Sequence, residues 1–282
     1  MIRPLSLSLT LAMLLAGPVA ADGQRVVAIG GAVTEIVFAL GLHDRLVARD
    51  TTSQWPDAAV ALPDVGYIRR LSPEGVLSMR PDLILAEDGA GPPEAVALLK
   101  SAGVPFQTIP AGETADAALA KVQAVAAALG ADPAPVLAPL RADLDRAADA
   151  AASTAATPRR VLFVLGVQGG RIMASGTGTA ADQMIRLAGA QNAITGYQGY
   201  KPLTDEAIIA AAPDAIVLMD RGDGSTDFAA RQAQIIAMPA IATTPAARQG
   251  RVIQMNGLYL LGFGPRTGAA ALDLHRALYG GA

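Results

Sequence analysis

Short apolar runs alternate with helix-like stretches along this chain. The runs at 26–29 and 161–165 are each followed by a turn and then by a stretch with helical periodicity, at 34–41 and 182–189. Short, fully apolar runs of this kind are typical of buried strands, and strands that alternate with helices indicate parallel sheets. The pattern therefore predicts an α/β fold.

A second pattern occurs twice in the chain at one constant spacing. In each copy a short predicted helix ends at a Pro-Asp pair, and an apolar run follows at 83–86 or at 215–219. The recurring residues are a glutamate, a proline and an aspartate: Glu74, Pro81 and Asp82, then Glu206, Pro213 and Asp214. This repeat predicts two similar Rossmann-like α/β lobes with central, mainly parallel sheets.

An alanine-rich stretch with prolines at its start separates the two copies. Alanine favours helix, and proline is accepted in the first helical turn, so we expect one long connecting helix over 135–153 and limited closure of the lobes. A last helix is expected over 268–279. The predicted organisation is a signal peptide at 1–21, an N-terminal lobe at 22–132, a connecting helix region at 133–156 and a C-terminal lobe at 157–282.

The first residues have the pattern of a secretory signal peptide. Arg3 is followed by an apolar stretch too short to span a membrane comfortably, and small residues at 19–21 offer a cleavage site. The chain has no cysteine, which excludes disulfides, thiolate metal sites and a lipidated N-terminal cysteine. We therefore expect a soluble mature chain that starts at Asp22 and acts in the periplasm of a Gram-negative bacterium.

Composition and charge narrow the function classes. A net charge of −3 without a basic block argues against nucleic acid and anionic membranes as partners. His43 and His275 are the two histidines, so a three-histidine metal site cannot be built. The nucleophile motif G-x-S-x-G does not occur, and the glycine-rich turn at 176–182 is more typical of a plain helix entry than of a phosphate loop. An enzyme is not expected.

Tyr67 is a candidate metal ligand, because it lies in a predicted turn close to an arginine. Tyr67 follows Gly66, where the backbone is expected to turn, and Arg69 lies two residues further on, which in an extended segment places both side chains on one face. A phenol beside a guanidinium ionises more easily than its usual pKa of about 10 allows, and phenolate is a ligand for ferric iron. The alternative is that Tyr67 only caps a loop.

Three segments carry a resemblance to a known family: A-R-D-T-T-S-Q-W-P at 48–56, V-G-Y-I-R-R-L-S-P-E-G at 65–75 and L-Y-L-L-G-F-G-P-R-T at 258–267. With the signal peptide, the two lobes and the connecting helix, the chain resembles the class III, TroA-like periplasmic substrate-binding proteins of iron-complex, cobalamin and haem ABC importers. The Tyr-x-Arg of the middle segment is most similar to the haem-binding members, because the siderophore and cobalamin binders generally lack it.

The resemblance implies a role for each matching residue. It makes Tyr67 the ligand of haem iron and places Arg69 beside the phenolate. Some members add a histidine from the second lobe, but the corresponding loop at 166–173 has none, which implies a five-coordinate iron or a weaker sixth ligand. Arg221 is a candidate second cation that faces the phenolate or a propionate. Three aromatic residues could offer stacking or apolar surface to the porphyrin, with core packing as the alternative for the last: Trp55, Tyr259 and Phe263.

The implied function is the capture of haem b, as transported ligand, in the cleft between the lobes and its delivery to an inner-membrane ABC permease. The alternative is a ferric-siderophore or cobalamin binding protein. We expect a monomer that is not embedded in the membrane. Acidic residues, one on each lobe, would meet permease arginines, with simple surface solvation as the alternative for each: Glu74 or Glu94, and Glu206 or Asp227.

Overall fold

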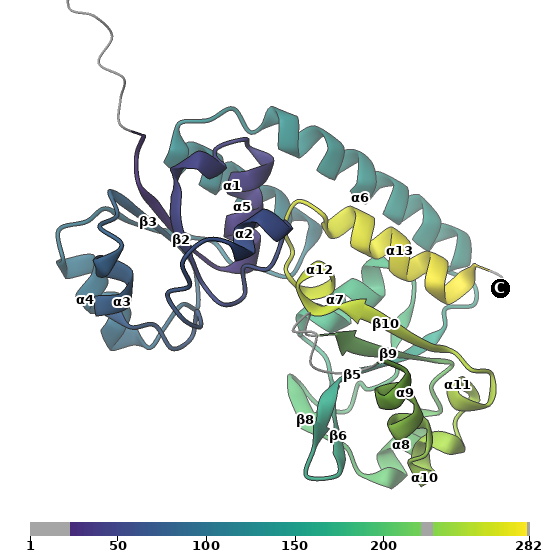
Figure 1. Ribbon diagram of the computed structural model, residues 1–282. Coiled ribbons are helices and arrows are strands. Elements are labelled where there is room, and N and C mark those ends of the chain that lie inside the picture. Colours follow the sequence, from purple (N-terminus) through teal and green to yellow (C-terminus); the bar gives the residue numbers. More distant parts are fainter. Residues whose placement is uncertain (1–22, 221–227, 281–282) are drawn as a thin grey trace, which may run out of the picture.

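Two sheets, one in each lobe, are joined by a long helix, α6 (Ala134–Thr154), in the computed structural model of the chain (Figure 1). The structure describes residues 23–220 and 228–280. The predicted signal peptide, Arg221 and Asp227 lie outside these residues. The predicted fold class is confirmed, and α6 closely matches the helix predicted at 135–153. The predicted residue limits of the lobes stay a prediction.

The sheet of the N-terminal lobe is parallel throughout and has the strand order β2-β1-β3-β4. Alternate residues of its central strands face opposite helix layers. Val26 and Ala28 pack toward α1 and α5, whereas Val27 and Ile29 pack toward α3 and α4. Because both faces are covered, these strands are apolar except for Glu87 at the end of β3. The strands are β1 (Val26–Ile29), β2 (Leu46–Arg49), β3 (Leu83–Glu87) and β4 (Phe106–Ile109). The helices are α1 (Gly31–Ala39), α2 (Asp57–Val60), α3 (Pro73–Ser78), α4 (Pro93–Ser101) and α5 (Ala115–Leu129), with a 3-10 turn at His43–Arg45.

The sheet of the C-terminal lobe has the order β10-β9-β5-β6-β8, and β7 also pairs with β5. Its core strands are parallel, whereas β6 and β8 are antiparallel. The sequence predicts a loop at 166–173, but in the structure most of this stretch is strand. It forms the hairpin between β5 and β6, because Gly169 and Gly170 adopt the positive φ angles, 57° and 77°, that a tight turn requires. The strands are β5 (Arg160–Gln168), β6 (Arg171–Ser175), β7 (Gln191–Asn192), β8 (Tyr200–Pro202), β9 (Ala215–Asp220) and β10 (Val252–Asn256).

The aspartate of each repeat copy makes an equivalent hydrogen bond in its own lobe. The Asp82 carboxylate accepts a hydrogen bond of 2.9 Å from the backbone N–H of Arg25, just before β1. The Asp214 carboxylate accepts one of 2.8 Å from Arg160, at the start of β5. Each aspartate thus joins the turn before one strand to the start of its parallel neighbour, which explains why the Pro-Asp pair recurs.

The C-terminal helix runs back along the connecting helix. Figure 1 shows α13 (Thr267–Tyr279) beside α6, and a Cβ atom on Gly268 would lie 2.5 Å from the backbone nitrogen of Leu144. The segment 257–266 therefore leads from the second lobe past the first. The remaining helices of the C-terminal lobe are α7 (Ala180–Leu187), α8 (Asp205–Ala211), α9 (Phe228–Ile236), α10 (Pro239–Ala242), α11 (Pro245–Arg248) and α12 (Gly257–Leu261). In the described part of the chain, no helix combines the length and apolar character needed to cross a bilayer.

Candidate functional site

A cavity of about 300 Å³ lies between the lobes, and we call it the tyrosine pocket. The first lobe contributes the turn that carries Tyr67, the end of β3, the loop before α5 and Lys121 from within α5. The second lobe contributes α12 through Leu258 and Leu261. The pocket lies outside the carboxyl ends of β1 and β3, where ligands of parallel sheets bind.

Tyr67 projects from a tight turn at the edge of this pocket. Gly66 has a φ of 99°, and the backbone N–H of Arg70 donates a hydrogen bond of 2.7 Å to the carbonyl of Tyr67. The segment is therefore a turn and not the extended strand that the spacing argument assumed. Tyr67 and Arg69 nevertheless line the same pocket, and Tyr67 is 43% exposed.

The turn is braced by the loop that follows β2. The backbone N–H of Thr51 donates to the carbonyl of Gly66 at 3.0 Å. The buried carboxylate of Asp50 accepts hydrogen bonds from the N–H of Gly30 at 3.0 Å and from the hydroxyl of Ser53 at 2.7 Å. The loop and the turn consequently form one hydrogen-bonded unit at the end of the parallel sheet.

A buried lysine forms the floor of the tyrosine pocket. Lys121 is 1% exposed, and its amine donates to the carboxylate of Glu87 and, at 3.1 Å, to the carbonyl of Gly262 in the second lobe. Neither Lys121 nor Glu87 was a sequence candidate, because a lysine in a helical stretch usually reads as a solvated position. The available signal was that Lys121 stands alone among apolar neighbours in an alanine-rich helix.

Glu113 and Tyr200, which no sequence pattern singled out, bring further polar groups to the pocket region. Partial burial raises the pKa of Glu113, while the N–H of Ala180 and the charges of Lys121 and Arg69 act in the opposite sense. Burial also raises the pKa of Tyr200, on which Glu113 and Arg69 act electrostatically. The two lobes thus interact through polar groups beside the tyrosine pocket.

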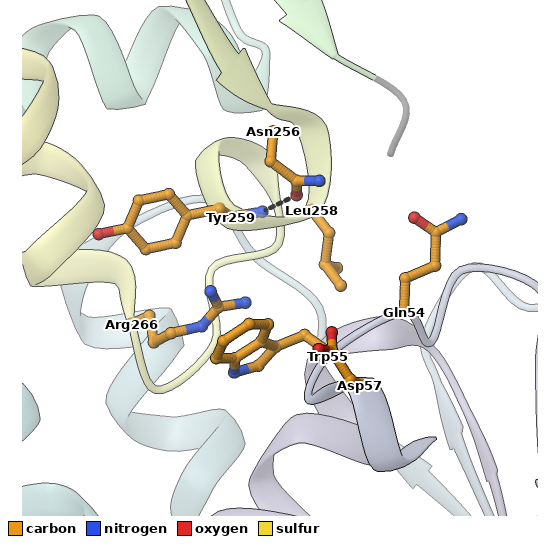
Figure 2. Close-up of a pocket in the computed structure, with 7 residues that line it drawn as sticks. All are labelled: Gln54, Trp55, Asp57, Asn256, Leu258, Tyr259 and Arg266. Carbon is orange, nitrogen blue, oxygen red and sulfur yellow. Dashed lines mark hydrogen bonds between the residues drawn. The ribbon is translucent and has the colours of Figure 1, made fainter. Parts of the chain in front are cut away.

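The predicted aromatic residues lie elsewhere. Trp55 and Tyr259 line a neighbouring cavity of about 340 Å³, which shares Leu258 with the tyrosine pocket, and both rings pack on the guanidinium of Arg266 (Figure 2). Their contact with a porphyrin stays a prediction. Phe263 is 1% exposed and belongs to the hydrophobic core, so the packing alternative describes it in this structure. Arg221 lies outside the described residues.

Comparisons with known proteins agree with this architecture. The periplasmic heme-binding protein BhuT, solved in complex with two hemes, is 46% identical with a TM-score of 0.84, over 91% of this chain and 98% of that one. The periplasmic heme-binding protein RhuT from Roseiflexus sp. RS-1 is 39% identical with a TM-score of 0.84, over 91% and 98% of the two chains.

A curated relative matches a shorter region. The vitamin B12-binding protein of Yersinia pestis (strain Pestoides F) is 35% identical over 83 residues, which are 29% of this chain and 30% of that protein. The matched regions span less than two thirds of the length of the first curated relatives. The sequence matches the family described as periplasmic binding protein over residues 26–257. Since this match includes both sheets and the connecting helix, the chain belongs to the periplasmic binding protein family.

Proposed function

We propose that this protein binds haem in the tyrosine pocket and delivers it to an inner-membrane ABC permease from the periplasm of a Gram-negative bacterium. The observation that carries the proposal is the position of Tyr67 and Arg69 on one turn, both lining a cavity between the lobes. Tyrosine is a known axial ligand of haem iron. The similar solved proteins with 46% and 39% identity are described as heme-binding, which supports the same ligand here.

The residues around Tyr67 suit such a ligand. On binding, the phenol loses its proton and the phenolate oxygen coordinates ferric iron, while Arg69 supplies a positive charge beside the anionic ligand. Ile68, Leu258 and Leu261 give the pocket apolar surface for the porphyrin edge. We propose haem b as the cargo and a monomeric carrier.

Two acidic residues at equivalent repeat positions are the proposed contacts with the permease. Glu74 and Glu206 are exposed and lie in the first turns of α3 and α8. Hydrogen bonds to its own backbone N–H and to Ser72 lower the pKa of Glu74, and the same arrangement with Thr204 lowers the pKa of Glu206. Both side chains therefore stay ionised and are available to cationic partners.

The test is an absorption titration of the purified mature protein with haemin. Wild-type protein should develop a Soret band and a ferric high-spin charge-transfer band, and Tyr67→Phe should lose the latter with affinity lower by at least about tenfold. Tyr197→Phe is the matched control, because the Tyr197 hydroxyl bonds to the carbonyl of Ala174 at 3.1 Å and does not line the pocket. An unchanged spectrum for Tyr67→Phe would contradict the assignment.

Cobalamin is the second candidate ligand, and the local similarity to a vitamin B12-binding protein favours it. Titration with cyanocobalamin and with ferric siderophores, in competition with haemin, separates the alternatives. Tighter binding of cobalamin or a siderophore than of haemin would replace haem as the proposed cargo.

A further inference from the structure

Arg266 lies where the two lobes meet, and its guanidinium makes two hydrogen bonds to a carboxylate of the first lobe. Its Nε is 2.6 Å from Oε1 of Glu35, and its Nη2 is 3.0 Å from Oε2. Glu35 is buried on α1 of the first lobe, whereas Arg266 precedes α13 at the end of the segment 257–266. Two parallel charge-assisted hydrogen bonds of this kind orient the guanidinium as well as attract it.

Aromatic rings from both lobes cover the guanidinium. Its central carbon lies 4.4 Å from the ring centre of Trp55, in the loop after β2, and 4.8 Å from that of Tyr259, on α12 (Figure 2). The hydroxyl of Tyr259 is itself held by Asp273 at 2.8 Å. We call Glu35, Trp55, Tyr259 and Arg266 the arginine clasp. A planar, permanently charged group suits this sandwich, and a lysine would not reproduce it.

The clasp is connected to the tyrosine turn through a short stretch of backbone. Trp55 belongs to the same loop as Thr51 and Thr52. Thr51 donates its N–H to the carbonyl of Gly66, the residue before Tyr67, and the hydroxyl of Thr52 accepts a hydrogen bond of 3.0 Å from Gly31. Thr52 also lines the tyrosine pocket. This loop therefore links Trp55 to the wall of the pocket that carries Tyr67.

The clasp differs from the deeper contact between the lobes. Lys121, at the pocket floor, is 1% exposed, whereas the Arg266 side chain is 27% exposed and Trp55 is 44% exposed. Opening the clasp consequently exposes little core, so its geometry can influence the cleft without unfolding either lobe.

We propose that the arginine clasp orders the loop of Trp55 and holds the two lobes at a defined separation beside the tyrosine pocket, which makes Arg266 a positioning residue for the bound ligand. This inference rests on the proposed function for the identity of that ligand. A preformed cleft loses less conformational freedom on binding, so loss of the clasp should act mainly on the rate of ligand release.

The chain supplies its own probe, because Trp55 is its single tryptophan. In Arg266→Gln, acrylamide should quench Trp55 fluorescence more strongly, since the guanidinium no longer covers one ring face. Haemin release to excess apomyoglobin should become about tenfold faster. The Soret and charge-transfer bands should keep their wild-type positions because Tyr67 is intact. Arg266→Lys should give intermediate values, since it keeps the charge without the planar fork.

Two further variants complete the experiment. Glu35→Gln removes the charge that orients Arg266 and should change quenching and release in the same direction. Arg248→Gln is the matched control, because Arg248 is an exposed arginine at the end of α11 in the C-terminal lobe and lines neither of the two cavities. It should match wild type in both measurements.

The outcomes separate the two proposals. If Arg266→Gln and Glu35→Gln leave haemin release at the wild-type rate, the clasp does not position the ligand, whatever happens to quenching. Unchanged Trp55 quenching would also overturn the inference, and that measurement needs no ligand. Failure of the wild-type protein to bind haemin would instead contradict the proposed function.

Discussion

The amine of Lys121 donates a hydrogen bond of 3.1 Å to the carbonyl oxygen of Gly262, across the junction of the two lobes. The same amine pairs with the carboxylate of Glu87, and both side chains line the tyrosine pocket. A residue that would usually be solvated is thus the point at which helix α5, strand β3 and the segment 257–266 are joined. The floor of the candidate site is consequently also part of the junction between the lobes.

Replacing this lysine should destabilise the protein strongly. Lys121→Met leaves the Glu87 carboxylate largely buried without its partner, so the free energy of unfolding in urea should fall by about 3 kcal/mol. The double variant Lys121→Met, Glu87→Gln removes the unpaired charge and should recover part of this loss. A single variant as stable as wild type would show that the pair contributes nothing.

The close contact between Gly31 and Leu258 of the other lobe should not tolerate a methyl group. A Cβ on Gly31 would lie 2.4 Å from Cδ1 of Leu258 and 2.7 Å from the carbonyl oxygen of Thr52. Gly31→Ala should therefore cost about 1–3 kcal/mol in the free energy of unfolding. Gly75→Ala in α3 is the control, because the nearest atoms to its Cβ would be those of the Ser72 side chain, 3.6 Å away, and it should be neutral or slightly stabilising. Equal effects at the two positions would argue against the tight lobe contact.

Replacing Arg69 and replacing its neighbour Arg70 should have different effects on haemin binding. Arg69 lines the tyrosine pocket, whereas its exposed neighbour Arg70 does not. Arg69→Gln should weaken haemin binding about tenfold because a positive charge beside the phenolate is lost. Arg70→Gln should bind as wild type does in the same titration. Equal losses would indicate a general effect of net charge and not a local one.

Glu113 should make stability depend on pH. Its pKa is raised from the ordinary value of 4.5, so the folded protein holds this proton more tightly than the unfolded chain does. Its contribution therefore favours folding at acidic pH and is lost as the pH rises through its folded pKa. In Glu113→Gln this dependence disappears, so Tm relative to wild type should rise between about pH 4 and about pH 7. A fall over that range would reverse the assigned direction.

The proposed docking residues can be tested on permease in nanodiscs. The double variant Glu74→Gln, Glu206→Gln should bind the permease at least about fivefold more weakly, because one charge contact is lost on each lobe. Haemin affinity should be unchanged, since neither residue lines the tyrosine pocket. Asp116→Asn removes an exposed charge from the first turn of α5 and is the control. Wild-type docking by the double variant would remove Glu74 and Glu206 as contacts.

Local patterns were sufficient to predict most elements near the site. The apolar runs at 26–29, 83–86 and 215–219 became β1, β3 and β9, and the alanine-rich stretch became α6. Gly66, just before Tyr67, correctly indicated a turn. The hydrogen bond that closes this turn, from the N–H of Arg70 to the carbonyl of Tyr67, depends on φ and ψ angles that spacing alone does not define. The glycines at 169–170 likewise permitted either an open loop or the hairpin that forms.

The sequence by itself determined the two-lobed α/β class, the connecting helix and Tyr67 with Arg69 as candidates, because these depend on periodicity, repetition and neighbours in the chain. Only the tertiary structure decided which distant side chains meet. Glu35 and Arg266 are 231 residues apart, and Lys121 and Gly262 are 141 apart. Such pairs form because packing of α13 along α6 returns the chain to the first lobe, and no local pattern records that contact.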